Sequence, residues 1–370
     1  MFATELPIDL PTQRQDQPLA IHKIKLIEGA EPVKVRPIPM SYGEQLLLME
    51  LVKELLDKGY ISPAPKGCPW SAPVFLLKKG NADRPGPVTN RYRIVTDYRA
   101  LNLLTVPSVY VPPCVRDVLN ALVNKKIFSK SDNLSGFYQA ALAEEDRVKT
   151  TFSCFTPDGL RSYFFNVACL GLQGTPSTYQ LFMEQCIDGI PGVWCYLDDL
   201  VYASDTLEEH LVLIRQVFER LASNQVYLNA LKCKWCKPDL DFLGMHIAHN
   251  HVTISEEKVQ GLKDFPVPRS QADVRRFVGF ATYLSQFVPN FAAEMVVLTD
   301  MMKAGVKKKF VWTTEAQKQF DGIRTKLIAS VGLMLPNLRG NFVLETDASG
   351  EGMGAVLYQQ MTVRNKKEII

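Results

Sequence analysis

Residues 193–203 decide the fold, and they read Val-Trp-Cys-Tyr-Leu-Asp-Asp-Leu-Val-Tyr-Ala. The runs 193–197 and 200–203 are rich in β-branched and aromatic residues, so each predicts a strand. Asp198 and Asp199 lie between these runs, and aspartate tolerates the backbone of a tight turn. The sequence therefore predicts a β-hairpin with two adjacent carboxylates at its tip.

Two adjacent carboxylates beside apolar strands repel each other, and burial makes their charges more costly unless a cation neutralises them. Magnesium prefers oxygen ligands and commonly takes one or two carboxylates together with substrate phosphates. A pair of such ions can stabilise both the attacking and the leaving oxygen of a phosphoryl transfer. The alternative interpretation is an ordinary turn with two solvated acids.

A third carboxylate could complete such a metal site. The run 127–132 predicts a strand that ends at Asp132, shortly before Gly136. Aspartate is common where strands end, so Asp132 taken alone fits an ordinary turn acid equally well. The metal hypothesis requires that Asp132 converge with the hairpin tip.

The rest of the chain alternates strands and helices. Ser41 and Glu44 form a capping box for an amphipathic helix that Gly59 ends, and Thr175 is expected to cap a helix that Pro176 opens. Further helices are expected over 207–224 and 270–287, and further strands over 72–77, 92–96, 151–155, 162–167 and 242–247. A polar connection, rich in glycine and proline, covers 80–90. Helices that follow a mixed sheet predict an α+β fold with a helical appendage.

Composition places the chain among globular proteins. Its 370 residues suit two or three compact units, and it is 46% hydrophobic and 22% charged. No apolar run approaches the roughly 20 residues of a spanning helix, and the N-terminus lacks the order of a signal peptide. We therefore expect an intracellular protein without a membrane partner or secretion signal. The net charge of +3 does not by itself indicate nucleic-acid binding.

Eight scattered cysteines are expected to be reduced thiols rather than disulfides. Cys233 and Cys236 have the spacing of a zinc pair, with His246, His249 and His251 downstream. Only nine residues separate Cys236 from His246, whereas a zinc finger needs about twelve. The sequence therefore gives a zinc site little support.

Several ordered motifs resemble the reverse transcriptases of gypsy-type (Metaviridae) long-terminal-repeat retrotransposons. The hairpin sequence Tyr196-Leu197-Asp198-Asp199 is similar to their YxDD motif. The resemblance covers about 300 residues and also runs through Trp70-Ser71-Ala72-Pro73-Val74, Asp97-Tyr98-Arg99-Ala100-Leu101-Asn102, Phe128-Ser129-Lys130-Ser131-Asp132, Leu228-Asn229, Lys232-Cys233, Phe242-Leu243-Gly244, Phe287-Val288-Pro289-Asn290-Phe291 and Glu345-Thr346-Asp347-Ala348-Ser349.

The resemblance implies a right-hand polymerase with fingers, palm and thumb, an antiparallel palm sheet, and an incomplete ribonuclease H-like segment. On this basis residues 1–40 are an extended N-terminal lead-in, 41–250 the fingers and palm, 251–310 a thumb-like helical region, and 311–370 a connection with a truncated ribonuclease H-like start. The implied activity is RNA-directed DNA polymerisation. Its partners are then an RNA or DNA template with a primer, deoxynucleoside triphosphates and other segments of a polyprotein.

The resemblance also implies roles for individual residues. Asp132, Asp198 and Asp199 become the catalytic ligands of two Mg²⁺ ions, for which Mn²⁺ can substitute. Four residues are expected to contact the nucleotide: Lys79, Arg93, Phe137 and Gln173. Arg93 follows Lys79 by a longer gap than the family shows, and many gypsy-type enzymes have an aromatic residue in place of Gln173. Primer or template contacts are expected from Tyr196, Phe242, Leu243, Gly244, Arg275 and Arg276.

The last part of the chain resembles the start of a ribonuclease H domain. Residues 341–347 and 353–358 match its first two strands, and Asp347 matches its first metal-binding acid. The remaining acids of that site have no counterpart, so we expect no ribonuclease H activity. No protease signature or zinc knuckle is recognised either. The chain is therefore expected to be a fragment of a polyprotein that acts in the cytoplasm or in a retrotransposon particle.

Two other functions compete with an active reverse transcriptase. Ser131 and Asn133 surround Asp132 with polar side chains where the family has apolar ones, which favours a degenerate or domesticated copy that binds nucleic acid without polymerising. A palm-type RNA polymerase is the second alternative. Phe137 argues against it, because a rigid ring under the sugar would clash with a ribose 2′-hydroxyl.

Overall fold

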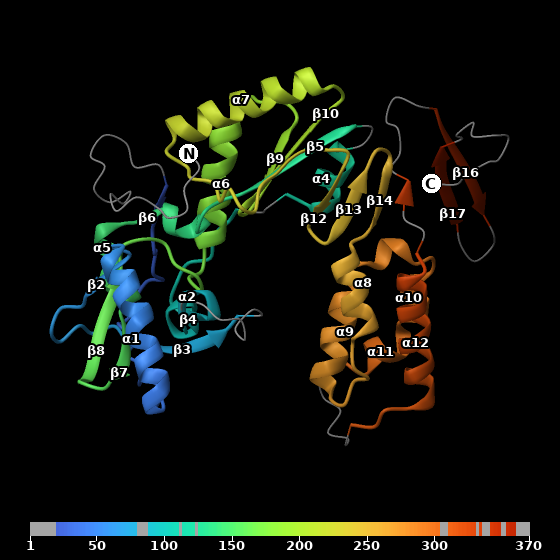
Figure 1. The fold of residues 1–370 in the computed structure, drawn as a ribbon. Helices are drawn as coiled ribbons and strands as arrows, with labels where there is room; N and C mark the ends of the chain where they lie inside the picture. Colours follow the sequence, from blue (N-terminus) through green and yellow to red (C-terminus); the bar gives the residue numbers. More distant parts are fainter. Residues whose placement is uncertain are drawn as a thin grey trace. The chain divides into compact units, whose positions relative to one another are not determined.

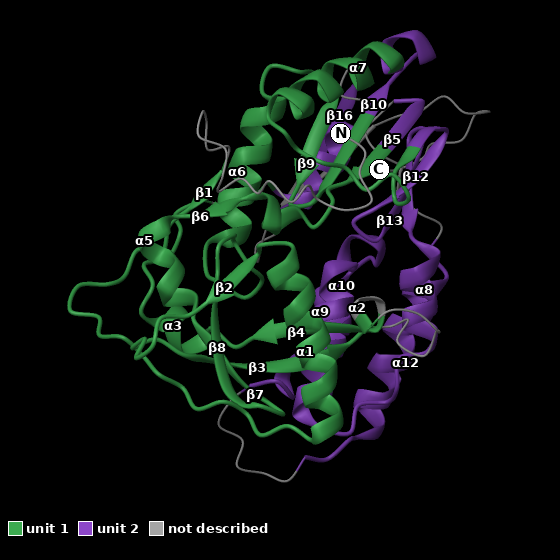
Figure 2. Ribbon diagram, turned by 60° about the vertical axis from the view of Figure 1, so that its left-hand side comes forward, with its two compact units in different colours: residues 1–113, 130–202, 211–234 green, residues 114–129, 203–210, 235–370 purple. Residues whose placement is uncertain are grey.

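The computed structural model describes residues 20–79, 88–110, 113–122, 125–303, 310–330, 333–334, 341–348 and 353–359. Figure 1 shows the helices and strands of this chain, and Figure 2 shows its two compact units. Unit 1 comprises residues 1–113, 130–202 and 211–234, and unit 2 comprises residues 114–129, 203–210 and 235–370. No helix in the described ranges is long and apolar enough to cross a membrane. Residues 1–19 of the predicted lead-in and 80–87 of the predicted connection lie outside the described residues.

Unit 1 combines strands with short and long helices. Its elements in chain order are β1 (Ile21–His22), α1 (Tyr42–Asp57), β2 (Ile61–Pro63), β3 (Ala72–Lys78), α2 (Val88–Arg91), β4 (Tyr92–Thr96), α3 (Arg99–Leu103), η1 (Gly136–Gln139), β6 (Ala141–Leu142), α5 (Glu144–Arg147), η2 (Val148–Thr150), β7 (Phe152–Thr156), β8 (Gly159–Phe165), α6 (Thr175–Ile187) and β9 (Val193–Tyr196). Four elements have residues in both units: β5 (Ile127–Asp132), β10 (Asp199–Ser204), α7 (Leu207–Ser223) and β11 (Lys234–Lys237).

A five-stranded sheet with the order β2-β8-β7-β3-β4 forms one part of unit 1. Its pairs are antiparallel except β3 with β7, which is parallel. Helix α1 packs against this sheet (Figure 1), and Leu48 and Val52 on its apolar face join Phe152 and Phe165 in one buried cluster. The predicted capping box is confirmed, because Ser41 and Glu44 bond each other's backbone N–H groups.

The described part of the lead-in lies along unit 1. Strand β1 pairs in parallel with β6, and Val35 and Ser71 bond through their backbones. The Asp146 carboxylate accepts the N–H of Ile24 at 2.7 Å. Residues 20–35 are thus held by backbone hydrogen bonds to segments far away in sequence.

The four-stranded sheet has the order β11-β5-β10-β9 and contains the predicted carboxylate hairpin. Helix α6 supplies a buried face, and α7 supplies another through Leu213, Val217 and Leu221. These three residues recur at helical spacing, which explains why α7 packs on one side only. The expected strands 127–132, 193–197 and 200–203 and the expected helix 207–224 are confirmed to within one residue at each end.

Unit 2 holds the second small sheet and a group of helices. Its elements are α4 (Val115–Ala121), β12 (Asp239–Phe242), β13 (Met245–Ala248), β14 (His251–Ile254), α8 (Glu256–Lys263), α9 (Gln271–Tyr283), η3 (Ser285–Phe287), α10 (Phe291–Glu294), α11 (Val296–Asp300), α12 (Thr314–Ile328), β15 (Leu333–Met334), β16 (Phe342–Ala348) and β17 (Met353–Gln359). Strands β12 to β15 form an antiparallel sheet in chain order. Helices α8, α9 and α12 pack together (Figure 1), with the Phe277 and Phe320 rings 4.5 Å apart between centroids.

The structure corrects the strand predicted over 242–247 and the predicted cap of α6. The predicted strand 242–247 is a tight hairpin, because Leu243 and Gly244 have φ of 51° and 74° and turn the chain between β12 and β13. The predicted cap of α6 is also displaced by one residue. Gly174, with φ of 84°, is the cap, and Thr175 is the first helical residue with its side chain buried.

Strands β16 and β17 form the antiparallel hairpin that the sequence predicts. Asp347 lies on β16 opposite Gly354, but its side chain is outside the described residues.

Candidate active site

The β9–β10 hairpin positions two of the three predicted acids. Tyr196 pairs with Asp199, so the two residues of the turn are Leu197 and Asp198. The predicted turn, Asp198-Asp199, is therefore one residue too late. Leu197 has φ of 54°, whereas Asp199 begins β10.

Strand β5 ends beside this turn and brings Asp132 to it. The N–H of Asn133 donates to the carbonyl of Asp198 at 3.0 Å. On its other side, Asp132 accepts the N–H of Asn229 at 2.9 Å through its carbonyl. The segment after α7 thus fixes the end of β5, and the two carboxylate-bearing turns converge as predicted.

The Asp198 carboxylate is packed tightly against the backbone of Gly136. A Cβ added to Gly136 would lie 2.3 Å from Asp198 Oδ1 and 2.8 Å from its Cγ. Only glycine allows the carboxylate this approach, because those separations are far below van der Waals contact. Gly136 is thus required by the position of Asp198.

Asp198 carries an unfavourable charge in this structure. Its Oδ1 atom is buried and has no hydrogen-bond partner among the described residues. Burial, together with the negative charges of Asp132 and Asp199, raises the pKa of Asp198 to about 6. The positive charge of Lys232 offsets this rise only in part, so a bound cation would relieve the remaining cost of the Asp198 charge.

Two lysines neutralise the other carboxylates. Lys232 Nζ lies 3.2 Å from Asp132 Oδ1, and Lys130 Nζ lies 2.7 Å from Asp199 Oδ2. Among the described residues, no three His, Cys, Asp or Glu side chains are grouped as metal ligands. A cation shared by the three aspartates would thus replace the lysine partners of Asp132 and Asp199.

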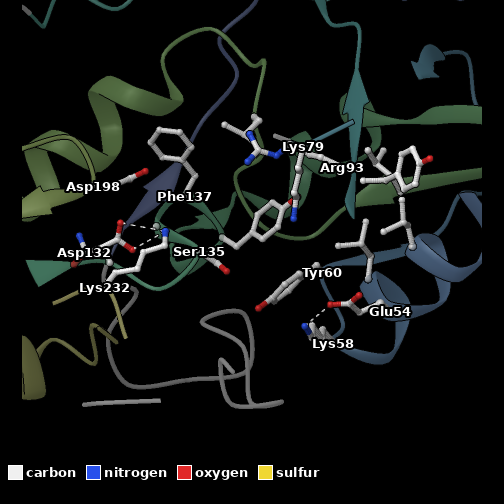
Figure 3. Close-up of a pocket in the computed structure, with 18 residues that line it drawn as sticks. Glu54, Lys58, Tyr60, Lys79, Arg93, Asp132, Ser135, Phe137, Asp198 and Lys232 are labelled. Carbon is white, nitrogen blue, oxygen red and sulfur yellow. Dashed lines mark hydrogen bonds and ion pairs between the residues drawn. The ribbon is translucent and has the colours of Figure 1, made fainter. Parts of the chain in front are cut away.

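A cavity of about 410 Å³ opens beside the acids and is lined within unit 1 by Asp132, Asp198, Phe137, Lys79 and Arg93, among others. Figure 3 shows the two acids at one end of this cavity and the two cations towards the other. Burial and the nearby positive charge of Arg93 lower the pKa of Lys79. Two cationic side chains close together in a cavity wall are suited to binding a polyanion.

Phe137 lies between the acids and the rest of the cavity (Figure 3). Its ring meets that of Tyr179 edge-on, with centroids 5.6 Å apart. Tyr179 is fully buried on α6, so it fixes the orientation of Phe137. The next residue, Tyr138, packs on Tyr60 with centroids 4.8 Å apart and closes the cavity wall.

The structure does not place Gln173 at the cavity. Its backbone N–H donates to the side chain of Asn102 at 2.9 Å, and it is not a lining residue. Leu170, three positions earlier in the same loop, lines the cavity instead. Gly171 and Gly174 both have positive φ, so the loop changes direction between Leu170 and α6 in a way that the sequence did not reveal.

The residues predicted to contact primer or template differ in availability. Tyr196 is half-buried on β9. Phe242 is fully buried, so its side chain belongs to the core, whereas Leu243 and Gly244 form the β12–β13 turn. Arg275 and Arg276 are exposed on α9 as predicted, but Arg276 is paired with the carboxylate of Asp273.

The polar neighbours of Asp132 are partly accommodated. Ser131 Oγ lies 2.9 Å from the buried Tyr202 hydroxyl, which satisfies both groups. Asn133 donates to Met183 Sδ at 3.5 Å, although its Oδ1 atom has no partner among the described residues. Ser131 therefore gives no support to a degenerate site, whereas Asn133 leaves one polar atom unsatisfied.

Sequence reasoning missed two residues that act on the site. Lys232 was recognised only as part of a motif, and its pairing with Asp132 depends on the path of the chain after α7. Gln180 was hidden in the apolar stripe of α6, although it is fully buried and bonds the hairpin backbone. A polar residue at a core position of a helix is the signal that could have identified Gln180.

Converging acids at a hairpin tip, next to a cavity with a cationic wall, form the arrangement that the sequence analysis expected for a polymerase palm. Residues 77–247 match the family described as "Reverse transcriptase (RNA-dependent DNA polymerase)". Residues 312–370 match an "RNase H-like domain found in reverse transcriptase". Over these two regions the chain is therefore similar to reverse transcriptases and to their ribonuclease H-like domain.

Relatives confirm the predicted resemblance to gypsy-type elements. The chain is 31% identical over 330 residues to the Retrovirus-related Pol polyprotein from transposon 297 of Drosophila melanogaster, covering 89% of this chain and 30% of that protein. It is 31% identical over 342 residues to the corresponding polyprotein of transposon gypsy, covering 89% and 32%. The Enzymatic polyprotein of Cauliflower mosaic virus (strain D/H) is 30% identical, covering 90% and 48%. The chain thus spans less than half the length of each of these relatives.

Solved structures confirm the fold. A foamy viral protease-reverse transcriptase in complex with double-stranded DNA superposes with a TM-score of 0.76 at 20% identity, covering 94% of this chain and 70% of that one. The same protein with an RNA/DNA hybrid gives a TM-score of 0.75 at 20% identity, covering 91% and 44%. The predicted right-hand polymerase fold is therefore confirmed.

Proposed function

We propose that this chain is an RNA-directed DNA polymerase that adds deoxynucleotides to a primer 3′ end. One observation carries the proposal. The buried Asp198 carboxylate has an unpartnered oxygen and stands near two further carboxylates, at the edge of a cavity with a cationic wall. Such a concentration of negative charge costs free energy unless it serves to bind cations.

Asp132, Asp198 and Asp199 would hold two divalent cations, and their oxygen ligands favour Mg²⁺, with Mn²⁺ as a substitute. When bound, such ions activate the primer 3′-hydroxyl and stabilise the charge that develops on the phosphate. The chain's own contribution is to hold the three carboxylates in place. At pH 7 Asp198 is mostly ionised, because its pKa of about 6 lies below that pH.

The cavity residues fit a deoxynucleoside triphosphate. Lys79 and Arg93 would bind the triphosphate, since an arginine can bond two phosphate oxygens while a lysine adds a compact charge. Phe137 would lie under the sugar and exclude a 2′-hydroxyl by steric contact. Leu170 takes the place at the cavity that the sequence analysis gave to Gln173.

A template with its primer is the proposed macromolecular substrate. The foamy viral relatives of this fold were solved with double-stranded DNA and with an RNA/DNA hybrid. Action within a cell or a retrotransposon particle, beside other segments of a polyprotein, remains a prediction.

Primer extension on poly(rA)/oligo(dT) with Mg²⁺ tests the proposal. The wild-type chain should extend the primer, and Asp198→Asn should lose nearly all of this activity because Asn removes the charge that binds the cation. Asp158→Asn is the matched control, since Asp158 is an exposed acid at the β7–β8 turn of the same unit.

Each outcome of this experiment has one meaning. Extension that persists in Asp198→Asn would refute the site. No extension by the wild-type chain would favour the degenerate, binding-only copy. Efficient ribonucleotide incorporation by the wild-type chain would favour a palm-type RNA polymerase.

A further inference from the structure

Gln180 joins helix α6 to the catalytic hairpin. Its side chain is 0% exposed, although it is polar. The amide Nε2 donates to the carbonyl of Cys195 at 2.9 Å, and the amide Oε1 accepts the backbone N–H of Leu197. One side chain therefore bonds the hairpin on both sides of Tyr196, immediately before the turn that bears Asp198.

The hairpin needs partners at these two points. Strand β9 is the last strand in the order of its sheet, so backbone groups on its outer side have no neighbouring strand. The N–H at the first position of the turn also has no partner within a two-residue hairpin. Since unsatisfied buried backbone groups are costly, the two bonds from Gln180 remove a real penalty.

The turn itself is strained. Leu197 adopts φ of 54°, a region that leucine rarely enters and that glycine occupies without cost. Such a backbone persists only when its surroundings enforce it. Among the described contacts that hold this turn, the Leu197 N–H bonds Gln180, while Cys195 Sγ donates to the Leu197 carbonyl and the Asn133 N–H donates to the Asp198 carbonyl.

A hydrogen bond to Glu184 fixes the orientation of the Gln180 side-chain amide. Nε2 also donates to Glu184 Oε1 at 2.9 Å, one helical turn further along α6. The Tyr110 hydroxyl donates to the same oxygen. A carboxylate can accept hydrogen bonds but cannot donate them. Glu184 therefore orients the NH₂ group of the Gln180 amide towards itself, which leaves the amide oxygen to accept the N–H of Leu197.

We propose that Gln180 is a positioning residue that sets the backbone of the Leu197–Asp198 turn and thereby the place of the Asp198 carboxylate. Its effect on catalysis rests on the proposed polymerase function. Its effect on the hairpin does not, so the two can be tested separately.

Gln180→Met tests the proposal, because methionine has a similar length and no hydrogen-bonding amide. Gln185→Met is the matched control, since Gln185 lies on the same helix and is exposed. Hydrogen exchange of peptides that span residues 193–199 reports the Leu197 amide directly. We expect exchange in this segment to become faster in Gln180→Met and to remain unchanged in Gln185→Met.

Steady-state kinetics give the second readout. Because a displacement of about 1 Å can lower a rate roughly 100-fold, kcat should fall by roughly 10- to 100-fold in Gln180→Met. The KM for the nucleotide should change little, since Gln180 does not line the cavity. A purely structural role would instead lower the fraction of active enzyme and the thermal midpoint, with kcat per folded molecule unchanged.

Gln180→Glu supplies a variant that separates folding from positioning. When protonated, the glutamic acid can donate to Cys195 and accept from Leu197 as Gln180 does, whereas the ionised form can only accept. The ratio of its kcat to that of the wild-type chain should therefore rise as the pH is lowered. A ratio independent of pH, or unchanged hydrogen exchange over 193–199 in Gln180→Met, would overturn the proposal. Faster exchange in a chain that lacks polymerase activity would support Gln180 while refuting the proposed function.

Discussion

Asp198→Asn should stabilise the protein when no divalent cation is present, even though it removes a catalytic group. The charge of Asp198 is disfavoured in the folded state, where its pKa rises from 3.8 to about 6. A rise of about 2 in pKa corresponds to roughly 3 kcal/mol, at about 1.36 kcal/mol for each pKa unit. The side chain is half-buried, so solvent screening reduces the expected gain to about 1–2 kcal/mol.

The gain should depend on pH with a definite sign. Between pH 3.8 and about 6, folded Asp198 binds a proton that the unfolded chain does not, so the wild-type chain becomes more stable as the pH falls through 6. The difference in the free energy of unfolding between Asp198→Asn and the wild-type chain should thus reach its whole value at pH 8 and vanish near pH 4. Magnesium should reverse the order at pH 8, because a cation at 100 times its Kd stabilises the wild-type chain by about 2.7 kcal/mol.

Thermal unfolding in EDTA and in Mg²⁺, at pH 8 and pH 4, measures these effects. In a unit of this size, a change of about 1 kcal/mol in the free energy of unfolding moves the midpoint of thermal unfolding by roughly 2–4 °C. Asp158→Asn should leave the midpoint unchanged under all four conditions. If Asp198→Asn were less stable than the wild-type chain in EDTA at pH 8, the unfavourable charge inferred for Asp198 would be wrong.

Three further changes test the cavity. Gly136→Ala should lower kcat roughly 100-fold by displacing the Asp198 carboxylate, whereas Gly43→Ala, with no atom within 4 Å of its added Cβ, should have no effect on primer extension. Phe137→Val should raise the ratio of kcat/KM for a ribonucleotide to kcat/KM for a deoxynucleotide by roughly 10- to 200-fold, because the pocket loses a steric contact. An unchanged ratio would show that Phe137 does not contact the sugar. Arg93→Lys should raise the KM for the nucleotide by roughly 10-fold, the loss of one charge-assisted bond, and an unaltered KM would place the triphosphate elsewhere.

The sequence predicted those parts of the fold that depend on local patterns. The capping box of Ser41 specifies its helix through contacts a few residues apart and is confirmed, and the helix predicted over 270–287 is present but ends four residues early, at Tyr283. The hairpin of Asp198 was predicted for the same reason. Its exact turn was not, because the left-handed φ of Leu197 goes with a bond to Gln180, seventeen residues earlier, which no local pattern reveals.

The features that the sequence did not predict depend on chain path. Lys232 reaches Asp132 across one hundred residues, because the segment after α7 runs back beside β5. Leu170 lines the cavity and Gln173 does not. The loop that carries both changes direction at Gly171 and Gly174, which have positive φ. The strand predicted over 242–247 failed because Leu243 was expected in an extended conformation but lies in a turn. Such long-range geometry leaves no periodic signal in a single sequence.

Binding of Mn²⁺, followed by electron paramagnetic resonance at pH 8 without nucleotide, tests the central claim most directly. The account predicts that the wild-type chain and Asp158→Asn bind Mn²⁺ alike, whereas Asp132→Asn and Asp198→Asn each bind it much more weakly. Equal Mn²⁺ binding by all four proteins would contradict the claim that these aspartates form a shared cation site.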